Sequence, residues 1–151
     1  RLVEWKTRAQ GTGIHPYLVV TEGESDAVTL WIHGIPAIAT GGADGWREEW
    51  YHYLDGFSRV LVVREPDTWQ LVLGVGKDCP NAVVVEFPTE AKDPNALFQA
   101  SGEAFPQRFQ ALVANSTLKA GEISSQEEAK KREDAKRQEE QAHRASEAAG
   151  G

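Results

Sequence analysis

The sequence predicts an α/β fold: a compact domain with a central, mostly parallel four-stranded sheet and helices on both faces. Three observations support this prediction. Four short runs of the sequence are apolar throughout, which is typical of strands buried on both faces of a sheet. A segment with helical character follows each run, and this alternation is typical of parallel sheets. The length of 151 residues allows one domain and an appendage, with a core large enough to fold without disulfides.

The first half of the chain contains two strand–helix units. A strand at residues 17–20 leads into a helix that Ser25 caps and Gly34 ends. A second strand, residues 35–39, is followed by a stretch in which aromatic residues recur at helical spacing. This spacing predicts an amphipathic helix over residues 45–55.

The second half repeats the pattern and adds two helices. Strands are expected at residues 60–63 and 82–87, joined by a helix at 68–75 whose end is weakened by two glycines. Helices at residues 93–100 and 105–113 then complete the domain. Right-handed crossovers place the C-terminal ends of all four strands at one edge of the sheet.

The C-terminal segment from Ser124 to Gly151 contains no Leu, Val, Ile or aromatic residue. Oppositely charged pairs such as Glu133 and Arg137 stand at the favourable i,i+4 spacing. With no apolar face to bury, this segment is expected to be a solvated helix that acts as a tether. The predicted organisation is an N-terminal extension at residues 1–14, a domain at 15–120 and a charged helical tail at 121–151.

Charge and composition restrict the class of protein. The chain has 16 Lys and Arg against 23 Asp and Glu, a net charge of −7, so it is not suited to holding a DNA duplex by bulk electrostatics. No apolar stretch approaches the roughly 20 residues needed to cross a bilayer, and no basic-then-apolar leader opens the chain. We therefore expect a cytoplasmic protein that does not enter membranes. The chain begins with Arg1 and lacks Met, which indicates a piece of something longer.

Carboxylates stand directly after the predicted strands. Glu22 follows the first strand, Glu65 and Asp67 follow the third, and Asp93 lies after the fourth. Taken singly, such a residue is more often a helix cap than a ligand, and Asp26 and Asp93 are the best candidates for caps. Taken together at one sheet edge, the carboxylates would repel one another unless a cation shared them. Mg²⁺ prefers such oxygen ligands, so the sequence predicts a magnesium site at this edge.

Three motifs of the sequence resemble those of Toprim domains, and they occur in the same order as in that family. The stretch VVTEGESDA resembles the opening motif, in which a hydrophobic strand runs into Glu-Gly and then an Asp. The stretch RVLVVREPD resembles the second motif, an acidic-x-acidic triplet. The stretch AKDPNALF is similar to the Lys-Asp-Pro-Asn segment of the bacterial DnaG-type primase class. The resemblance covers residues 15–100 and is greatest to primase-helicases of phages, plasmids and other mobile elements.

The resemblance implies a site for Mg²⁺ (or Mn²⁺). Glu22 would act as a ligand or general acid/base, Glu65 and Asp67 would be the metal-binding pair, and Asp93 would be an additional ligand. Supporting or phosphate-binding roles would belong to Gly23, Asp26, Lys92 and Asn95. The implied activity is nucleotidyl transfer that makes primers on a single-stranded DNA template from nucleoside triphosphates, with a helicase motor beyond the tail.

Departures from the family pattern leave alternatives open. Glu65 stands where Asp is usual, Thr68 and Trp69 stand where a Gly is common, and Asn95 replaces an Asp. A Toprim-type nuclease would use the same ligands with water as the nucleophile. A degenerate, non-catalytic module that binds nucleic acid is the third hypothesis, and Trp69 is the tryptophan that could stack a base.

Overall fold

The sheet has four parallel strands in the order β2-β1-β3-β4. A computed structural model describes residues 17–151, so the predicted N-terminal extension at residues 1–14 lies outside the described part of the chain. The strands are β1 (Tyr17–Thr21), β2 (Ala37–Ala39), β3 (Arg59–Arg64) and β4 (Val83–Glu86). The prediction of a central four-stranded parallel sheet is confirmed.

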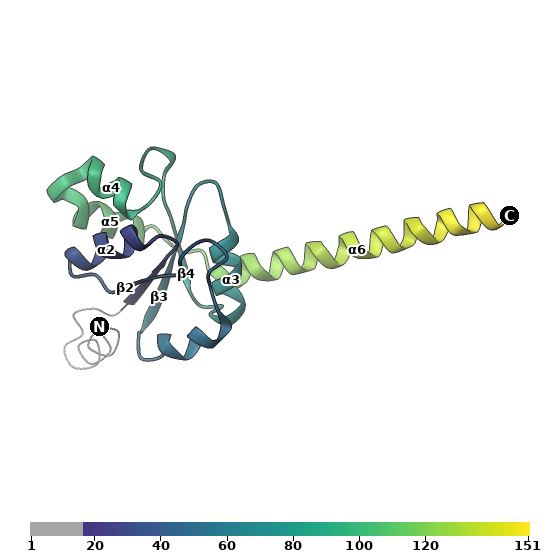
Figure 1. The fold of residues 1–151 in the computed structure, drawn as a ribbon, viewed down its shortest axis with the longest axis horizontal. Coiled ribbons are helices and arrows are strands. Elements are labelled where there is room, and N and C mark those ends of the chain that lie inside the picture. The colour runs from purple at the N-terminus through teal and green to yellow at the C-terminus, as the bar shows by residue number, and fades with distance from the viewer. Residues whose placement is uncertain (1–16) are drawn as a thin grey trace.

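Helices cover both faces of this sheet (Figure 1). The α-helices are α2 (Glu24–Ile32), α3 (Gln70–Asp78), α4 (Pro94–Ser101), α5 (Phe105–Ala114) and α6 (Ala120–Gly150). Three short 3-10 helices are η1 (Glu48–Leu54), η2 (Thr89–Ala91) and η3 (Gly102–Ala104). One face packs against α2, α4 and α5, and the other against α3, the end of η1 and the start of α6. The predicted two-sided covering is therefore also confirmed.

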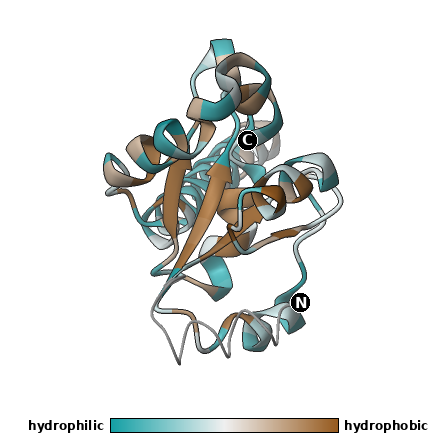
Figure 2. Ribbon diagram, turned by 90° about the vertical axis from the view of Figure 1, so that its left-hand side faces the viewer, coloured by the Kyte–Doolittle hydropathy of each residue, from teal (hydrophilic) through white to brown (hydrophobic). Residues whose placement is uncertain are grey.

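The central residues of the strands are apolar because their side chains meet a helix layer on either face of the sheet. In β1, Val19 belongs to the core on the α2, α4 and α5 side, while Leu18 and Val20 belong to the core on the α3 side. All three side chains are fully buried. Figure 2 shows the same feature as continuous brown along the strands. This double burial explains why the strands lack the polar–apolar alternation of a half-exposed sheet.

Two local predictions are wrong. Residues 45–55 do not form an amphipathic α-helix: only Glu48–Leu54 are helical, in a 3-10 turn, and Leu54 is its only buried residue. The aromatic spacing predicted a buried face that the segment lacks, since Tyr51 and Tyr53 are exposed. Ser25 does not cap α2 either, because that helix already begins at Glu24 with Gly23 at the N-cap position.

The glycines of α3 do not weaken its end as predicted. The helix continues through Gly74 and Gly76 to Asp78, because the missing side chains let other segments approach. A β-carbon on Gly76 would lie 2.3 Å from both the Ala120 carbonyl oxygen and the Ser124 Oγ. Gly76 is therefore the point at which α6 contacts α3.

The first turn of α6 belongs to the body of the domain. The Ala120 amide donates to the Ala82 carbonyl at 2.8 Å, and the Val84 amide donates to the Leu118 carbonyl at 2.9 Å, so this segment pairs with β4. The Ser124 hydroxyl donates to the Leu73 carbonyl of α3 at 2.9 Å. Beyond this anchor the 31-residue helix extends away from the domain (Figure 1). In the described part of the chain, no helix combines the length and apolarity that a membrane span needs.

We predict that Gly76→Ala destabilises the domain by about 1–3 kcal/mol, the usual cost of forcing a methyl group into a filled contact. Gly74→Ala is the matched control, because a β-carbon there would lie 3.4 Å from the Trp46 β-carbon and the backbone is helical. The control should be neutral or slightly stabilising. Urea unfolding of both variants measures the difference, and equal losses of stability would show that α6 does not dock through Gly76.

Candidate metal centre

The order of the strands creates a switch point between β1 and β3. From β1 the chain moves outward to β2 on one side, and from β3 it moves outward to β4 on the other. Ligands of open α/β sheets bind outside the carboxyl ends of the strands at such a point. Glu22 directly follows β1 and Glu65 directly follows β3. The two glutamates therefore lie where this architecture most often builds a binding site.

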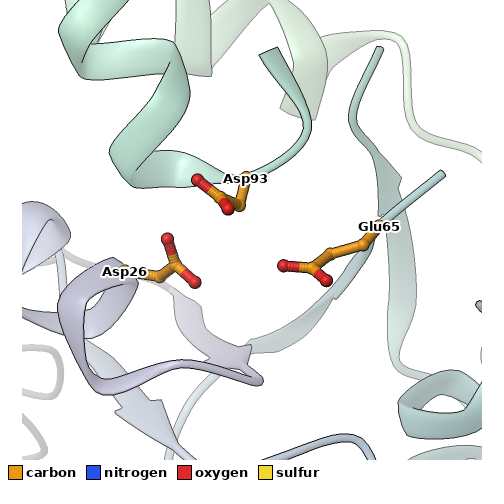
Figure 3. A group of neighbouring side chains, drawn as sticks. All are labelled: Asp26, Glu65 and Asp93. Carbon is orange, nitrogen blue, oxygen red and sulfur yellow. The ribbon is translucent and has the colours of Figure 1, made fainter. Parts of the chain in front are cut away.

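Three carboxylates meet at this edge. Asp26, Glu65 and Asp93 each offer an oxygen, and these oxygens lie within 4.8 Å of one another (Figure 3). Asp26 comes from the first turn of α2, Glu65 from the turn after β3, and Asp93 from the N-cap of α4. They border an open cleft of about 520 Å³, which is lined by Glu22, Gly23, Glu24, Ser25, Asp26, Gly41, Gly42, Glu65 and Asp93.

The start of α4 fixes two of the three carboxylates. Asp93 caps this helix by accepting a hydrogen bond from the Ala96 amide at 2.7 Å, as predicted. Asp26, predicted to cap its own helix, instead accepts a hydrogen bond from the Asn95 amide at 3.1 Å. The first turn of α4 thus stabilises both negative charges with its free N–H groups and its dipole. It also holds the two side chains beside each other.

Glu22 is fixed through its backbone. Its carbonyl oxygen accepts hydrogen bonds from the Gly41 amide at 3.1 Å and the Gly42 amide at 3.0 Å. Both glycines have positive φ angles, 77° and 134°, so a side chain at either position would strain this loop. These hydrogen bonds hold the loop after β2 against the end of β1. The half-buried Glu22 lines the same cleft as the three carboxylates.

Burial, assisted by neighbouring negative charge, raises two pKa values at the site. Burial raises the pKa of Glu65 to about 7, assisted by the charge of Glu22, a hydrogen bond with Glu22, and the charges of Asp93 and Asp26. Burial also raises the pKa of Asp26 to about 6, with a further contribution from Asp93 and opposition from the Asn95 amide. A divalent cation among these oxygens would relieve the repulsion, and hard carboxylate oxygens are the ligands that Mg²⁺ takes. The donor set therefore fits a metal ion.

The remaining site residues predicted from the sequence occupy different places. Gly23 lines the cleft, and a β-carbon there would come within 2.9 Å of the Asp26 Oδ2. Asn95 contributes its amide to Asp26, and its side-chain oxygen lies 3.5 Å from the Thr29 hydroxyl. Asp67 and Lys92 are exposed and are not among the residues that line the cleft.

Sequence reasoning gave Asp26 only a supporting place, whereas the structure puts it among the three converging carboxylates. The available signal was its position four residues after Glu22, one helical turn into a helix that starts at the strand end. Gly41 and Gly42 also form part of the wall of the cleft.

The chain is an α/β domain with an acidic cluster that could hold a metal ion, and its fold is similar to that of a DNA primase domain. A solved DNA primase domain from Pseudomonas aeruginosa matches with a TM-score of 0.56 and 25% identity, over 80% of this chain and 39% of that chain. The Gene 57 protein of Mycobacterium phage D29 is 31% identical over 88 residues, which is 57% of each protein. No protein-family model matches the sequence. The chain thus spans little more than half of the phage protein and less than half of the primase domain.

The raised pKa values predict that metal-free protein loses stability as pH rises. Between about 4.5 and about 7 the folded state binds more protons at Glu65 than the unfolded state does, so the free energy of unfolding falls with rising pH. Asp26 acts in the same direction between about 3.8 and about 6. Thermal unfolding in EDTA across this range measures the effect.

Glu65→Gln should flatten this pH dependence and raise the stability of the metal-free protein above pH 7, because it removes one of the crowded charges. Glu90→Gln, at an exposed position after β4, is the control and should leave the profile unchanged. A profile that is the same in the wild type and in Glu65→Gln would mean that Glu65 is not crowded by its neighbours.

Proposed function

We propose that this chain is the Toprim module of a DNA primase or primase-helicase, which joins nucleotides on a single-stranded DNA template in a reaction that depends on Mg²⁺ (or Mn²⁺). The observation that carries the proposal is the meeting of Asp26, Glu65 and Asp93 beside Glu22 at the β1/β3 switch point. The primase-like fold supports the choice of this activity over other uses of an acidic cleft.

In the proposed reaction the 3′-oxygen of a nucleotide paired with the template attacks the α-phosphorus of an incoming nucleoside triphosphate. A bond forms between that oxygen and phosphorus, the bond to the β-phosphate oxygen breaks, and pyrophosphate leaves. Glu22 would accept the proton of the attacking hydroxyl, because it lies at the mouth of the cleft beside the other carboxylates. Asp26, Glu65 and Asp93 would hold the metal ion, which when bound would supply charge neutralisation to the phosphates.

The wider assignment follows the organisation predicted from the sequence. Residues 15–120 would form the catalytic module, and the tail at 121–151 would lead to a helicase motor. Asp67 would join the ligands once substrate and metal draw the turn after β3 inward, and Lys92 would contact phosphate. The partners would be single-stranded DNA and nucleoside triphosphates, and the location cytoplasmic.

A non-catalytic module is the second candidate, and one observation favours it. Asp67, half of the predicted metal-binding pair, is exposed and is not among the residues that line the cleft. A site that lacks this ligand would keep a metal-binding cluster of three carboxylates and could still position nucleic acid. Metal binding and product analysis separate the two candidates.

We predict that wild-type protein binds Mg²⁺ or Mn²⁺ in calorimetry, and that Glu65→Gln weakens this binding roughly tenfold or more, since it removes a charged ligand. Asp67→Asn is the informative comparison because it removes an equal charge from the same turn. A loss in Glu65→Gln alone favours the three-carboxylate cluster, and a loss in both variants favours the pair predicted from the sequence. Wild-type protein that binds neither ion at millimolar concentration would contradict the proposed function.

We predict that Glu22→Gln lowers primer synthesis roughly a hundredfold or more, which is the usual contribution of a general acid or base. The assay uses the longest native protein that contains this chain, with labelled single-stranded DNA, Mg²⁺ and nucleotides. New oligomers identify a primase, whereas fragments shorter than the DNA identify a nuclease. Glu90→Gln, at an exposed position that does not line the cleft, is the control, and full activity of Glu22→Gln would rule out its proposed role.

A further inference from the structure

Arg64, the last residue of β3, is stacked on Trp69. Its guanidinium carbon lies 4.2 Å from the centroid of the indole ring, and Trp69 packs against the core on the α3 side. Val62, two residues earlier in the same strand, belongs to that core as well. Because side chains alternate along a strand, Arg64 lies on the α3 side of the sheet, whereas Glu65 turns toward α2 and α4. The two neighbours thus stand on opposite sides of the same sheet edge.

The protein leaves much of the hydrogen-bonding capacity of this guanidinium unused. Among the described residues its ion pair is with Glu86: Nη1 lies 3.7 Å from Oε1, and the Glu86 side chain is 55% exposed. Arg64 Nε is buried and has no hydrogen-bond partner among the described residues. A long pair with an exposed carboxylate contributes little, and a buried donor without a partner is costly enough to need an explanation.

Both the backbone and the side chain of Arg64 contact neighbouring residues. The Phe87 amide donates to the Arg64 carbonyl oxygen at 3.1 Å, which ties the end of β3 to β4. The indole ring supports the guanidinium plane, and a stacked guanidinium presents its N–H groups as a preformed fork. Such a fork matches two oxygens of a phosphate group. The side chain is 19% exposed, so part of it is accessible to solvent.

An anionic substrate also needs a positive charge at this place. The chain has a net charge of −7, and the cleft across the edge is lined by carboxylates. A phosphate approaching this edge is repelled unless a fixed cation compensates for the local field. Arg64 is covalently next to Glu65, so a phosphate bound to it would lie beside the candidate metal centre.

We propose that Arg64, supported by Trp69, is a phosphate-binding residue that holds the substrate across the carboxyl edge of the sheet from the metal centre. The proposal rests on the proposed function, since it takes the phosphate to be that of a nucleotide or of a nucleic-acid backbone. In this arrangement Trp69 positions the arginine and does not stack a base on the face that Arg64 covers.

Binding of two probes to the wild type and variants tests the proposal. One arm measures ATP with Mg²⁺ by calorimetry, and the other measures a labelled short oligothymidylate in EDTA at low salt by fluorescence polarisation. Arg64→Gln should bind at least one probe roughly tenfold more weakly, the loss expected for a charge-assisted hydrogen bond to phosphate. Weaker binding of ATP alone assigns the phosphate to the nucleotide, and weaker binding of the oligonucleotide assigns it to the backbone.

Two controls separate phosphate binding from charge and from structure. Arg59→Gln removes the same charge from the opposite, exposed end of β3, and should have little effect. Glu86→Gln breaks the ion pair, and should leave binding unchanged or make it tighter because it releases the guanidinium. A loss in Glu86→Gln as large as that in Arg64→Gln would mean a structural role and would overturn the proposal. Equal binding by Arg64→Gln and Arg59→Gln in both arms, or no binding of either probe by the wild type, would also overturn it.

If Arg64→Gln lowers the melting temperature, Arg64→Lys tests the same proposal with a variant that keeps the positive charge. Lysine preserves the charge and an aliphatic stem over Trp69 but lacks the fork, so binding should still weaken, and wild-type binding by this variant would overturn the proposal. The oligonucleotide arm contains EDTA and does not depend on the metal centre. Failure of metal binding in the wild type therefore contradicts the proposed function alone, whereas loss of the Arg64 effect contradicts this inference alone.

Discussion

Repulsion among carboxylates is the constraint on which the rest of this structure depends. A parallel sheet sends the ends of all its strands to one edge, and this chain places acidic residues after β1, β3 and β4. Asp26, Glu65 and Asp93 consequently lie within 4.8 Å of one another, where burial and like charge raise the pKa of Glu65 to about 7. Carboxylates with raised pKa values are typical of functional sites, because a bound cation or substrate supplies the positive charge or hydrogen bonds that the protein itself does not provide.

Backbone N–H groups hold the acidic residues of this edge in place. The first turn of α4 donates to both Asp26 and Asp93, and the loop at Gly41 and Gly42 donates to the backbone of Glu22. Among the described residues that line the cleft there is no Lys or Arg. The positive charge lies on the other side of the edge, where Arg64 rests on Trp69. The candidate metal ligands and the proposed phosphate-binding arginine thus lie on opposite sides of the same sheet edge.

The long helix α6 adds a mechanical element to this chemistry. Its first turn pairs with β4 and packs on α3 through Gly76, so its direction is set by the domain and not by a flexible joint. The rest of the helix is stabilised by its own charges, as in the contact between Arg137 and Glu133 at 2.8 Å. A helix of 31 residues spans about 46 Å at 1.5 Å per residue. If the tail carries a motor, as proposed, it would hold that motor at a defined distance.

The sequence by itself determined the features that depend on neighbouring residues: the apolar strands, the helices between them, the Asp93 cap and the polar tail. It also placed Glu22 and Glu65 at strand ends, since strand direction is implied by the alternation of elements. The tertiary structure alone decided that Asp26 binds the start of α4, that Asp67 remains exposed, and that Gly76 receives α6 instead of ending α3. The contacts of Asp26 and Gly76 are with residues 40 or more positions away along the chain, and the exposure of Asp67 depends on which way its turn faces. Local periodicity carries no information about either. The same reason explains η1, where the aromatic spacing was helical but only the last residue of the segment, Leu54, is buried in the core.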